Sequence, residues 1–215
     1  MRGTFRESGQ AAPIYITMVA GLLFLAFAFF AVGQAGATRN GAQSAADAAA
    51  LAAAQESRDQ FRDGLLGGLL DPDFLVDVFN GDTIGTYNGC QAASRFADEN
   101  GADVLPGACG WLTDGRWGFR VEVVTQGTVG DSVLPGTENK RARAQATAIV
   151  VPRCTFEPAE QEENPPEEGE EGAEGEPVSP GVLQCGGGTD WHIDPAKLDL
   201  LPDMADLFSV RLAED

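Results

Sequence analysis

The sequence contains one histidine, the side chain best suited to acid–base or metal chemistry near neutral pH. His192 lies between Asp190 and Asp194 in the run TDWHID, and such a cluster can bind a metal ion or act as a general base. A lone histidine beside Trp191 is more often a packed or exposed residue, however. We therefore predict no catalytic or metal role for this cluster.

Other stretches resemble functional motifs only in part. Ser132 in GDSVL lacks the second glycine of a nucleophile elbow. Asp71 and Asp73 begin like a calcium loop, but the glycine and terminal glutamate of an EF-hand do not occur at the right places after them. The sequence also has no glycine-rich phosphate loop. It therefore predicts no cofactor and a protein that is not an enzyme.

The cysteines give the clearest chemical prediction. Cys90, Cys109, Cys154 and Cys185 are even in number and widely spaced, with no CxxC pair that would indicate zinc or a redox site. Four cysteines allow three pairings, and we expect Cys90 with Cys109 and Cys154 with Cys185. Loops of this size contribute about 3 kcal/mol each in the chain-entropy model. Reduced, buried cysteines are the alternative if the domain faces the cytoplasm.

The composition limits both the size of the domain and its partners. The chain has 215 residues, with 14 Lys+Arg against 33 Asp+Glu, and a formal net charge of -19. This length accommodates one ordinary domain, or one domain with appendages. Because so acidic a chain repels phosphate backbones, we expect no nucleic-acid partner.

An apolar segment near the N-terminus has the length of a membrane span. Residues 11–32 read AAPIYITMVAGLLFLAFAFFAV, and no charged residue occurs between Gly9 and Thr38. A helix crosses a bilayer with about 20 such residues. We therefore predict a transmembrane helix over residues 11–33 and the membrane lipid bilayer as a partner.

The basic residues Arg2 and Arg6 favour a cytoplasmic N-terminus over residues 1–10, which places the rest of the chain outside the cytoplasm. A cleaved secretory signal is the alternative, because residues 35–37 (AGA) form an A-x-A site. The apolar run is longer than the usual signal core of about 7 to 15 residues, which favours a retained anchor. Both interpretations leave the bulk of the chain extracytoplasmic.

Residues 34–63 are rich in alanine and predict an exported helix that continues the transmembrane one. We expect a bend near Asn40-Gly41 and an end before Gly64. Small side chains recur at helical spacing on two adjacent ridges, which are Ala42, Ala46, Ala50 and Ala54, and Ala45, Ala49 and Ala53. Such ridges let a neighbour approach closely. That neighbour is either another protein, including a second copy, or the chain's own sheet, and both interpretations stay open.

This N-terminal region resembles a known family. GQAAPIYITMVAGLLFLAFAFF followed by TRNGAQSAADAAALAAA, over roughly residues 9 to 60, resembles the Tad-type Flp pilus-assembly proteins of the TadE/TadG-like group. The resemblance implies an anchored, exported domain that serves a surface pilus or a secretion apparatus. Two family features are missing. Ile14 stands where prepilin processing after Gly9 prefers glutamate, and no D-x-S-x-S run of a von Willebrand A-type metal site occurs. The chain therefore resembles a short, TadE-like form or a truncated relative.

Residues 64–156 predict a small disulfide-bonded α+β domain. Residues 64–73 (GLLGGLLDPD) indicate a break with a Pro turn. CQAASRFADEN predicts a short helix with Ala93, Phe96 and Ala97 on one face, stopped by Gly101. The run TDG at residues 113–115 indicates a hairpin.

Two strands are predicted from alternating patterns. RWGFRVEVV alternates through Trp117, Phe119, Val121 and Val123. RARAQATAIVV repeats the period, with one side formed by Ala142, Ala144, Ala146, Ala148 and Val150 and the other by Arg141, Arg143, Gln145 and Thr147. We expect these strands to pair antiparallel and to cover a helix.

The C-terminal third begins with a strongly acidic tract. Residues 157–177 contain ten glutamates and no basic residue, so residues 157–181 are predicted to be a disordered linker that acts as a spacer or holds cations. In residues 182–215, Asp194-Pro195 indicates a helix start that leads into AKLDLL. LFSVRLA predicts a final strand that returns to the main sheet, held there by the second disulfide.

The predicted fold class is α+β: one transmembrane helix continues into a long exported helix, followed by a small antiparallel sheet domain with short helices and a disordered acidic loop. Two functions fit this organisation. The first is a structural component of pilus or secretion assembly, with other assembly proteins or a second copy as partners through the alanine-rich helix. The second is a secreted or tethered acidic binding module of the cell envelope.

Overall fold

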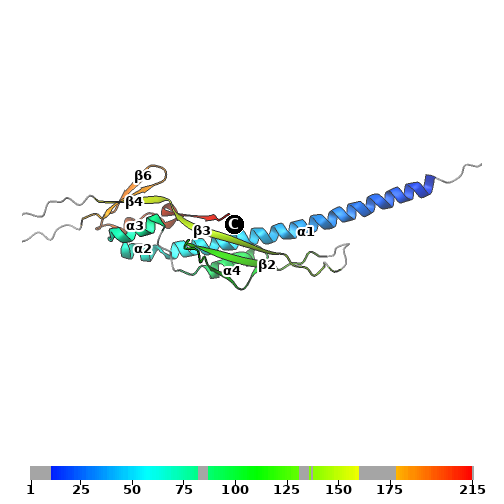
Figure 1. Ribbon diagram of the computed structural model, residues 1–215, viewed down its shortest axis with the longest axis horizontal. Coiled ribbons are helices and arrows are strands. Elements are labelled where there is room, and N and C mark those ends of the chain that lie inside the picture. Colours follow the sequence, from blue (N-terminus) through cyan, green and yellow to red (C-terminus); the bar gives the residue numbers. More distant parts are fainter. Residues whose placement is uncertain (1–10, 82–86, 131–135, 137, 160–177, 215) are drawn as a thin grey trace, which may run out of the picture.

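The computed structural model describes residues 11–81, 87–130, 136, 138–159 and 178–214. One helix dominates it: α1 (Ala11–Gln60) has 50 residues and is about 75 Å long. Its N-terminal end projects alone, and its C-terminal half lies within the domain (Figure 1). α1 passes through Asn40 and Gly41 in unbroken helical conformation, which confirms that the apolar helix continues into the alanine-rich one.

The chain stays helical beyond the predicted end of this helix. After an irregular turn at Phe61, the helical path continues as α2 (Arg62–Gly68). The Leu65 amide donates a hydrogen bond to the Phe61 carbonyl at 2.9 Å. Leu65 and Leu69 are fully buried. The predicted break at residues 64–73 is therefore wrong over its first half, because the two leucines place a helical turn against the core.

The expected Pro turn is the start of another helix, α3 (Pro72–Asn80). The Asp71 carboxylate accepts hydrogen bonds from the amides of Asp73 and Phe74, and Pro72 occupies the first turn. Gly81 ends the helix in the left-handed conformation (φ 83°). This helix buries Leu75, Val78 and Phe79.

Helix α4 (Cys90–Glu99) confirms the prediction of a short helix before Gly101, which has φ 69°. Ala93 and Ala97 are buried as expected, and Ala92 joins them. Phe96, predicted on the same face, is 36% exposed, with the Arg95 guanidinium 5.4 Å from its ring centroid. Alanine and not phenylalanine fits this face because α4 packs closely on α1.

The main sheet has four antiparallel strands in the order β1-β2-β3-β7. They are β1 (Ala102–Trp111), β2 (Gly118–Thr125), β3 (Arg143–Pro152) and β7 (Phe208–Leu212). β1 and β2 form the hairpin predicted around residues 113–115, and its last pair is Trp111 with Phe119. The predicted pairing of β2 with β3 is confirmed, as is the return of the C-terminal strand, where Val210 pairs with Val150.

A second, three-stranded sheet has no counterpart in the sequence predictions. It has the order β4-β5-β6, with β4 (Cys154–Pro158), β5 (Gly181–Cys185) and β6 (Thr189–His192). The ends of the predicted acidic linker therefore belong to strands, while its middle, residues 160–177, lies outside the described residues.

The predicted helix after Asp194-Pro195 is also wrong. A turn and the 3-10 helix η1 (Leu198–Leu200) replace it, followed by α5 (Met204–Leu207). The Asp194 carboxylate accepts a hydrogen bond from the Ala196 amide at 2.9 Å and forms an ion pair with Lys197 at 3.1 Å. These contacts lower the pKa of the Asp194 carboxyl below its usual value, and the hydrogen bond from the Ala196 amide is the larger cause. Pro202 leaves too few residues for a longer helix.

The core lies between the main sheet and the helices. The sheet's inner face, with Phe119, Val121 and Val123 fully buried, covers the C-terminal half of α1, and α4 packs beside it. Aromatic rings fill the end of this core where α1 stops. Phe61 lies 5.1 Å from Trp117 and Phe79 lies 5.5 Å from Phe208, measured between ring centroids.

Candidate functional site

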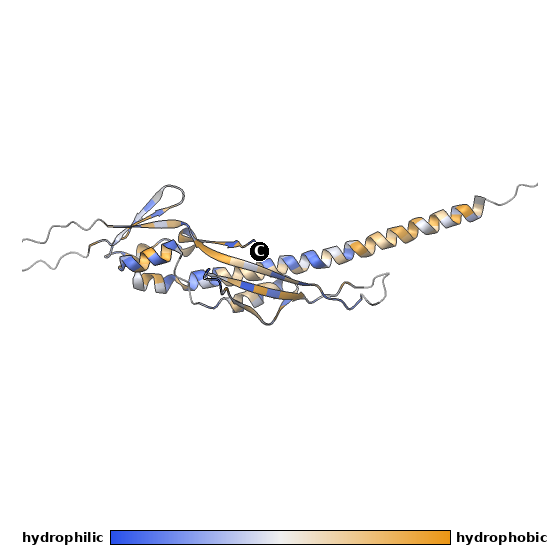
Figure 2. Cartoon of the chain, in the orientation of Figure 1, coloured by the Kyte–Doolittle hydropathy of each residue, from blue (hydrophilic) through white to orange (hydrophobic). Residues whose placement is uncertain are grey.

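The N-terminal half of α1 exposes large apolar side chains along its whole length. Ile14, Phe24 and Phe29 are 62%, 72% and 76% exposed. Figure 2 shows this projecting half as a nearly unbroken hydrophobic stretch of helix. Residues 11–32 are here called the apolar rod. Among the described residues, it is the one helical stretch long and apolar enough to cross a membrane, judged by length and composition. Residues 11–32 rise about 33 Å, which matches a hydrocarbon core of about 30 Å.

The C-terminal half of α1 has the opposite character. The seven alanines of the two predicted ridges are all 0% exposed, and they are Ala42, Ala45, Ala46, Ala49, Ala50, Ala53 and Ala54. β2, β3 and α4 cover them. Of the two interpretations left open by the sequence, the structure shows packing on the chain's own sheet. A partner protein therefore has to contact α1 on another face.

The alanines are small because neighbouring backbones come very close. A Cβ atom built on Gly89, just before α4, would overlap the carbonyl oxygen of Ala53 on α1. Such an approach is open only to glycine opposite alanine or glycine. The seven buried alanines, here called the alanine face, thus allow α4 and the sheet to pack at short distance from α1.

Two polar contacts fix α1 against the sheet. The buried hydroxyl of Ser57 accepts a hydrogen bond from the Trp117 indole N–H at 3.0 Å. Fourteen residues earlier, the side-chain amide of Gln43 donates a hydrogen bond to the backbone carbonyl of Gln145 at 3.3 Å. Because a buried donor without a partner is costly, the Ser57 contact favours one rotation of α1 in the core. The sequence analysis did not identify Ser57, whose only signal is a serine inside an alanine-rich helix.

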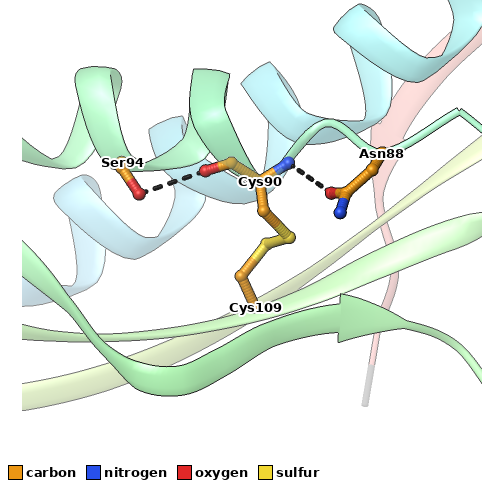
Figure 3. Close-up of a disulfide and its surroundings, with 4 residues drawn as sticks. All are labelled: Asn88, Cys90, Ser94 and Cys109. Atoms are coloured by element: carbon orange, nitrogen blue, oxygen red, sulfur yellow. Dashed lines mark hydrogen bonds between the residues drawn. A yellow bond between two sulfur atoms is a disulfide. The ribbon is translucent and has the colours of Figure 1, made fainter.

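Both disulfides join the cysteines in the expected pairs. Cys90 at the start of α4 is bonded to Cys109 on β1, with a Cα–Cα distance of 5.8 Å (Figure 3). The Asn88 side chain accepts a hydrogen bond from the Cys90 amide at 2.9 Å. Cys154 and Cys185 face each other in the register of β4 and β5. The first bridge therefore ties α4 to the main sheet, and the second closes the smaller sheet.

The candidate chemical residues that the structure describes are not assembled into a site. His192 is exposed on β6, while Asp194 belongs to the turn before η1. Asp71 serves as a helix cap, and Ser132 lies outside the described residues. Within the part of the chain that the structure describes, no group of three His, Cys, Asp or Glu side chains is arranged to hold a metal ion. A hollow of about 590 Å³ lies beside the second disulfide and is lined by Arg153, Gln184 and Asp190 among others.

Comparison with known protein families identifies a match in the N-terminal part of the chain. Residues 9–56 match the model of the Tad family, described as Flp pilus-assembly TadE/G-like. This confirms the resemblance noted over residues 9 to 60. The matched segment contains the apolar rod and most of the alanine face, and it ends before the sheet domain begins. No curated protein and no solved structure matches the chain.

Proposed function

We propose that the chain is a membrane-anchored, non-enzymatic component of Flp pilus or surface-secretion assembly. The observation that carries this proposal is the continuity of α1 through the family-matched segment. One helix is a lipid-facing rod at its start and the centre of a folded domain at its end. The apolar half and the folded domain are therefore joined by continuous helix, and this direct connection supports the role of an anchored assembly component.

The domain is placed outside the cytoplasm in this proposal. Arg2 and Arg6 precede the apolar run and favour a cytoplasmic N-terminus. Two disulfides in the domain support an oxidising compartment. Fusing alkaline phosphatase, which folds only in an oxidising compartment, after residue 214 tests the orientation. Active fusions are expected, and inactive fusions at normal expression would contradict it.

Assembly contacts are assigned to the exposed side of α1. Gly36 and Ala37 are exposed just beyond the apolar rod, whereas Ala46 is fully buried. A photo-crosslinking residue at position 36 or 37 should capture a pilus-assembly protein or a second copy in cells that carry the system. The same residue at exposed Gln91 on α4 is the matched control.

Loss of surface pili after deletion of the gene, restored by the wild-type chain, is the corresponding functional test. Normal piliation in the deletion strain would refute the assembly role.

An acidic binding module of the envelope is the second candidate. It is favoured by the occupied alanine face, since a domain whose helix ridges are filled has to act through its outer surface. The N-terminal residue of the mature protein separates the two candidates. A start at Met1, Arg2 or Gln10 retains the rod and supports the anchored component. A start at Thr38 removes the rod and supports the secreted module, because the buried alanine face would remain complete.

A further inference from the structure

The end of the β2–β3 ribbon that points along α1 towards the apolar rod is basic. The two strands continue as a ribbon beyond their ends. The Thr125 amide donates to the Ala142 carbonyl and the Val129 amide to the Lys140 carbonyl, both at 2.9 Å. Lys140, Arg141 and Arg143 are exposed there. None of the three forms an ion pair with a described residue.

Contacts along the helix show which way this ribbon points. α1 and β3 run in the same direction. Near the start of β3, Gln145 accepts a hydrogen bond from the Gln43 side chain of α1. Near its end, the Val150 amide donates to the carbonyl of Trp117, whose indole contacts Ser57 further along α1. The 14 helical residues between Gln43 and Ser57 rise about 21 Å, and the five strand residues after Gln145 rise about 17 Å. The two elements therefore advance together, and residues before Gln145 lie beside earlier residues of α1.

The same scale places the basic residues at the end of the rod. Lys140 precedes Gln145 by five residues, or about 17 Å, which corresponds to about 11 residues of helix and hence to Val32. Burial on α1 agrees with this position. Ala31 is 6% exposed, Gln34 and Thr38 are half-buried, and Ala42 is fully buried, all on one helical face. Figure 1 shows the ribbon running beside α1 in this direction.

If a bilayer surrounds the apolar rod, the lipid headgroups lie close to the position of Val32 along α1. The hydrocarbon core is about 30 Å thick and the headgroup layers add about 5 to 7 Å on each side. With residues 11–32 in the core, the headgroup layer on the domain side begins near Gly33. Arg39 lies about 10 Å beyond Val32 along α1, just outside this layer, and its exposed side chain is long enough to reach back to it.

We propose that Arg39, Lys140, Arg141 and Arg143, here called the basic collar, bind the anionic phosphate headgroups of the leaflet on the domain side. The collar contrasts with a chain of net charge -19. β4 and β5, which flank the acidic tract, lie at the opposite end of the domain (Figure 1). The described acidic side chain at the collar's end, Glu138, accepts a hydrogen bond from the Gly136 amide at 2.9 Å.

Binding at the collar would give the domain a second attachment to the membrane, beside the helix itself. A single helix leaves rotation about its own axis free, whereas a ribbon held at the headgroups fixes which face of the domain looks along the membrane. This inference rests on the proposed membrane anchoring and holds for either orientation of the chain.

The test uses the full chain in vesicles of phosphatidylcholine, with or without phosphatidylglycerol. A donor fluorophore is placed on Asn139→Cys, an exposed position beside Lys140, and the acceptor is a headgroup-labelled lipid. The native cysteines are all disulfide-bonded, so the new thiol is labelled selectively. We expect higher energy transfer in the anionic vesicles, decreasing as salt is added.

Neutralising the collar should abolish this difference. Each basic residue near an anionic surface changes the docked-to-free ratio about fivefold, so Lys140→Gln/Arg141→Gln/Arg143→Gln shifts it by about 100-fold. The matched control removes the same charge at exposed positions elsewhere, with Arg95→Gln/Lys197→Gln/Arg211→Gln. The control should retain the wild-type dependence on lipid.

Two negative outcomes are separable. A chain that floats with the vesicles but shows equal transfer in both lipids, or is unaffected by the collar substitutions, would overturn the collar alone. A chain that does not float with the vesicles would overturn both the anchor and the collar.

Discussion

The two halves of α1 share one backbone and have opposite surfaces. Residues 11–32 carry large side chains that are exposed, among them Phe24 at 72% and Phe29 at 76%. In residues 42–57, alanines such as Ala46 and Ala50 are fully buried. In a soluble helix the larger apolar side chains would be the buried ones. The inversion follows from the neighbour of each half, which is protein backbone for the second half and, in the proposed anchoring, lipid for the first.

Helix propensity alone does not explain the alanines. Leucine is nearly as good a helix former as alanine, and it would bury more apolar area. What excludes it is distance, as the contact between Gly89 and the Ala53 carbonyl shows. The buried half therefore gains its stability from the close packing of small groups, and the apolar half, in the proposed anchoring, from the transfer of large side chains into lipid.

Enlarging the alanine face should have the largest effect on this contrast. Replacing Ala46 and Ala50 with leucine adds buried volume where strands and α4 leave no space, and we expect a loss of about 5 kcal/mol for the pair. Ala26→Leu on the rod is the matched control and should leave the domain unchanged, because Ala26 is exposed. Thermal unfolding of the detergent-solubilised chain, followed by near-UV circular dichroism, measures both. Equal melting temperatures would show that the face has room.

Removing the first disulfide tests what holds α4 and the main sheet against the buried half of α1. Replacing Cys90 and Cys109 with serine should cost about 3 kcal/mol and loosen α4 from the sheet. The same replacement at Cys154 and Cys185 should cost a similar amount while leaving α1 covered, because that bridge closes the smaller sheet. Hydrogen exchange of the amides of residues 42–57 distinguishes the two. Faster exchange in both variants would show that the sheets unfold as one unit.

Much of this architecture is predictable because the patterns are long. The apolar run, the alternation in β2 and the returning strand β7 each extend over several residues and agree with their final environment. The alternation predicted for β3 is wrong in its second half, because Thr147, expected on the polar side, is buried together with Ala146 and Ala148. Asp-Pro pairs show the limit of short signals. The sequence predicts a turn at Asp71-Pro72, where a helix begins, and a helix start at Asp194-Pro195, where a turn forms.

The two Asp-Pro pairs differ in the residues that come after them. After Pro72 come Leu75, Val78 and Phe79, which share one helical face and fit the core. After Pro195 the next proline arrives at position 202, before a comparable face can form. Tertiary contact decides the first case and chain length the second. The neighbour of the alanine face is unpredictable for the same reason, since a ridge of methyl groups does not specify what fills its groove.

Removing a single hydroxyl from each half should have a smaller effect. Ser57→Ala leaves the buried Trp117 indole without its acceptor, and we expect a loss of about 1 to 2 kcal/mol. Thr17→Ala in the rod removes only a bond to the carbonyl of Ile14 in its own helix, at 2.9 Å, and should be close to neutral. Chemical denaturation followed by tryptophan fluorescence compares them. A neutral Ser57→Ala would mean that water replaces the hydroxyl.

The smallest effect is expected at Gly41, where the two halves meet. Gly41 is exposed in the middle of α1, and a Cβ atom built there has no neighbour within 4 Å. Gly41→Ala should therefore stabilise the isolated chain by about 0.5 to 1 kcal/mol, through lower backbone entropy in the unfolded state. Gly89→Ala should have the opposite sign, since its Cβ overlaps the Ala53 carbonyl. Thermal unfolding again provides the measurement. A destabilised Gly41→Ala would mean that α1 needs a flexible joint between its lipid-facing and buried halves, and that the domain is not rigidly coupled to its anchor.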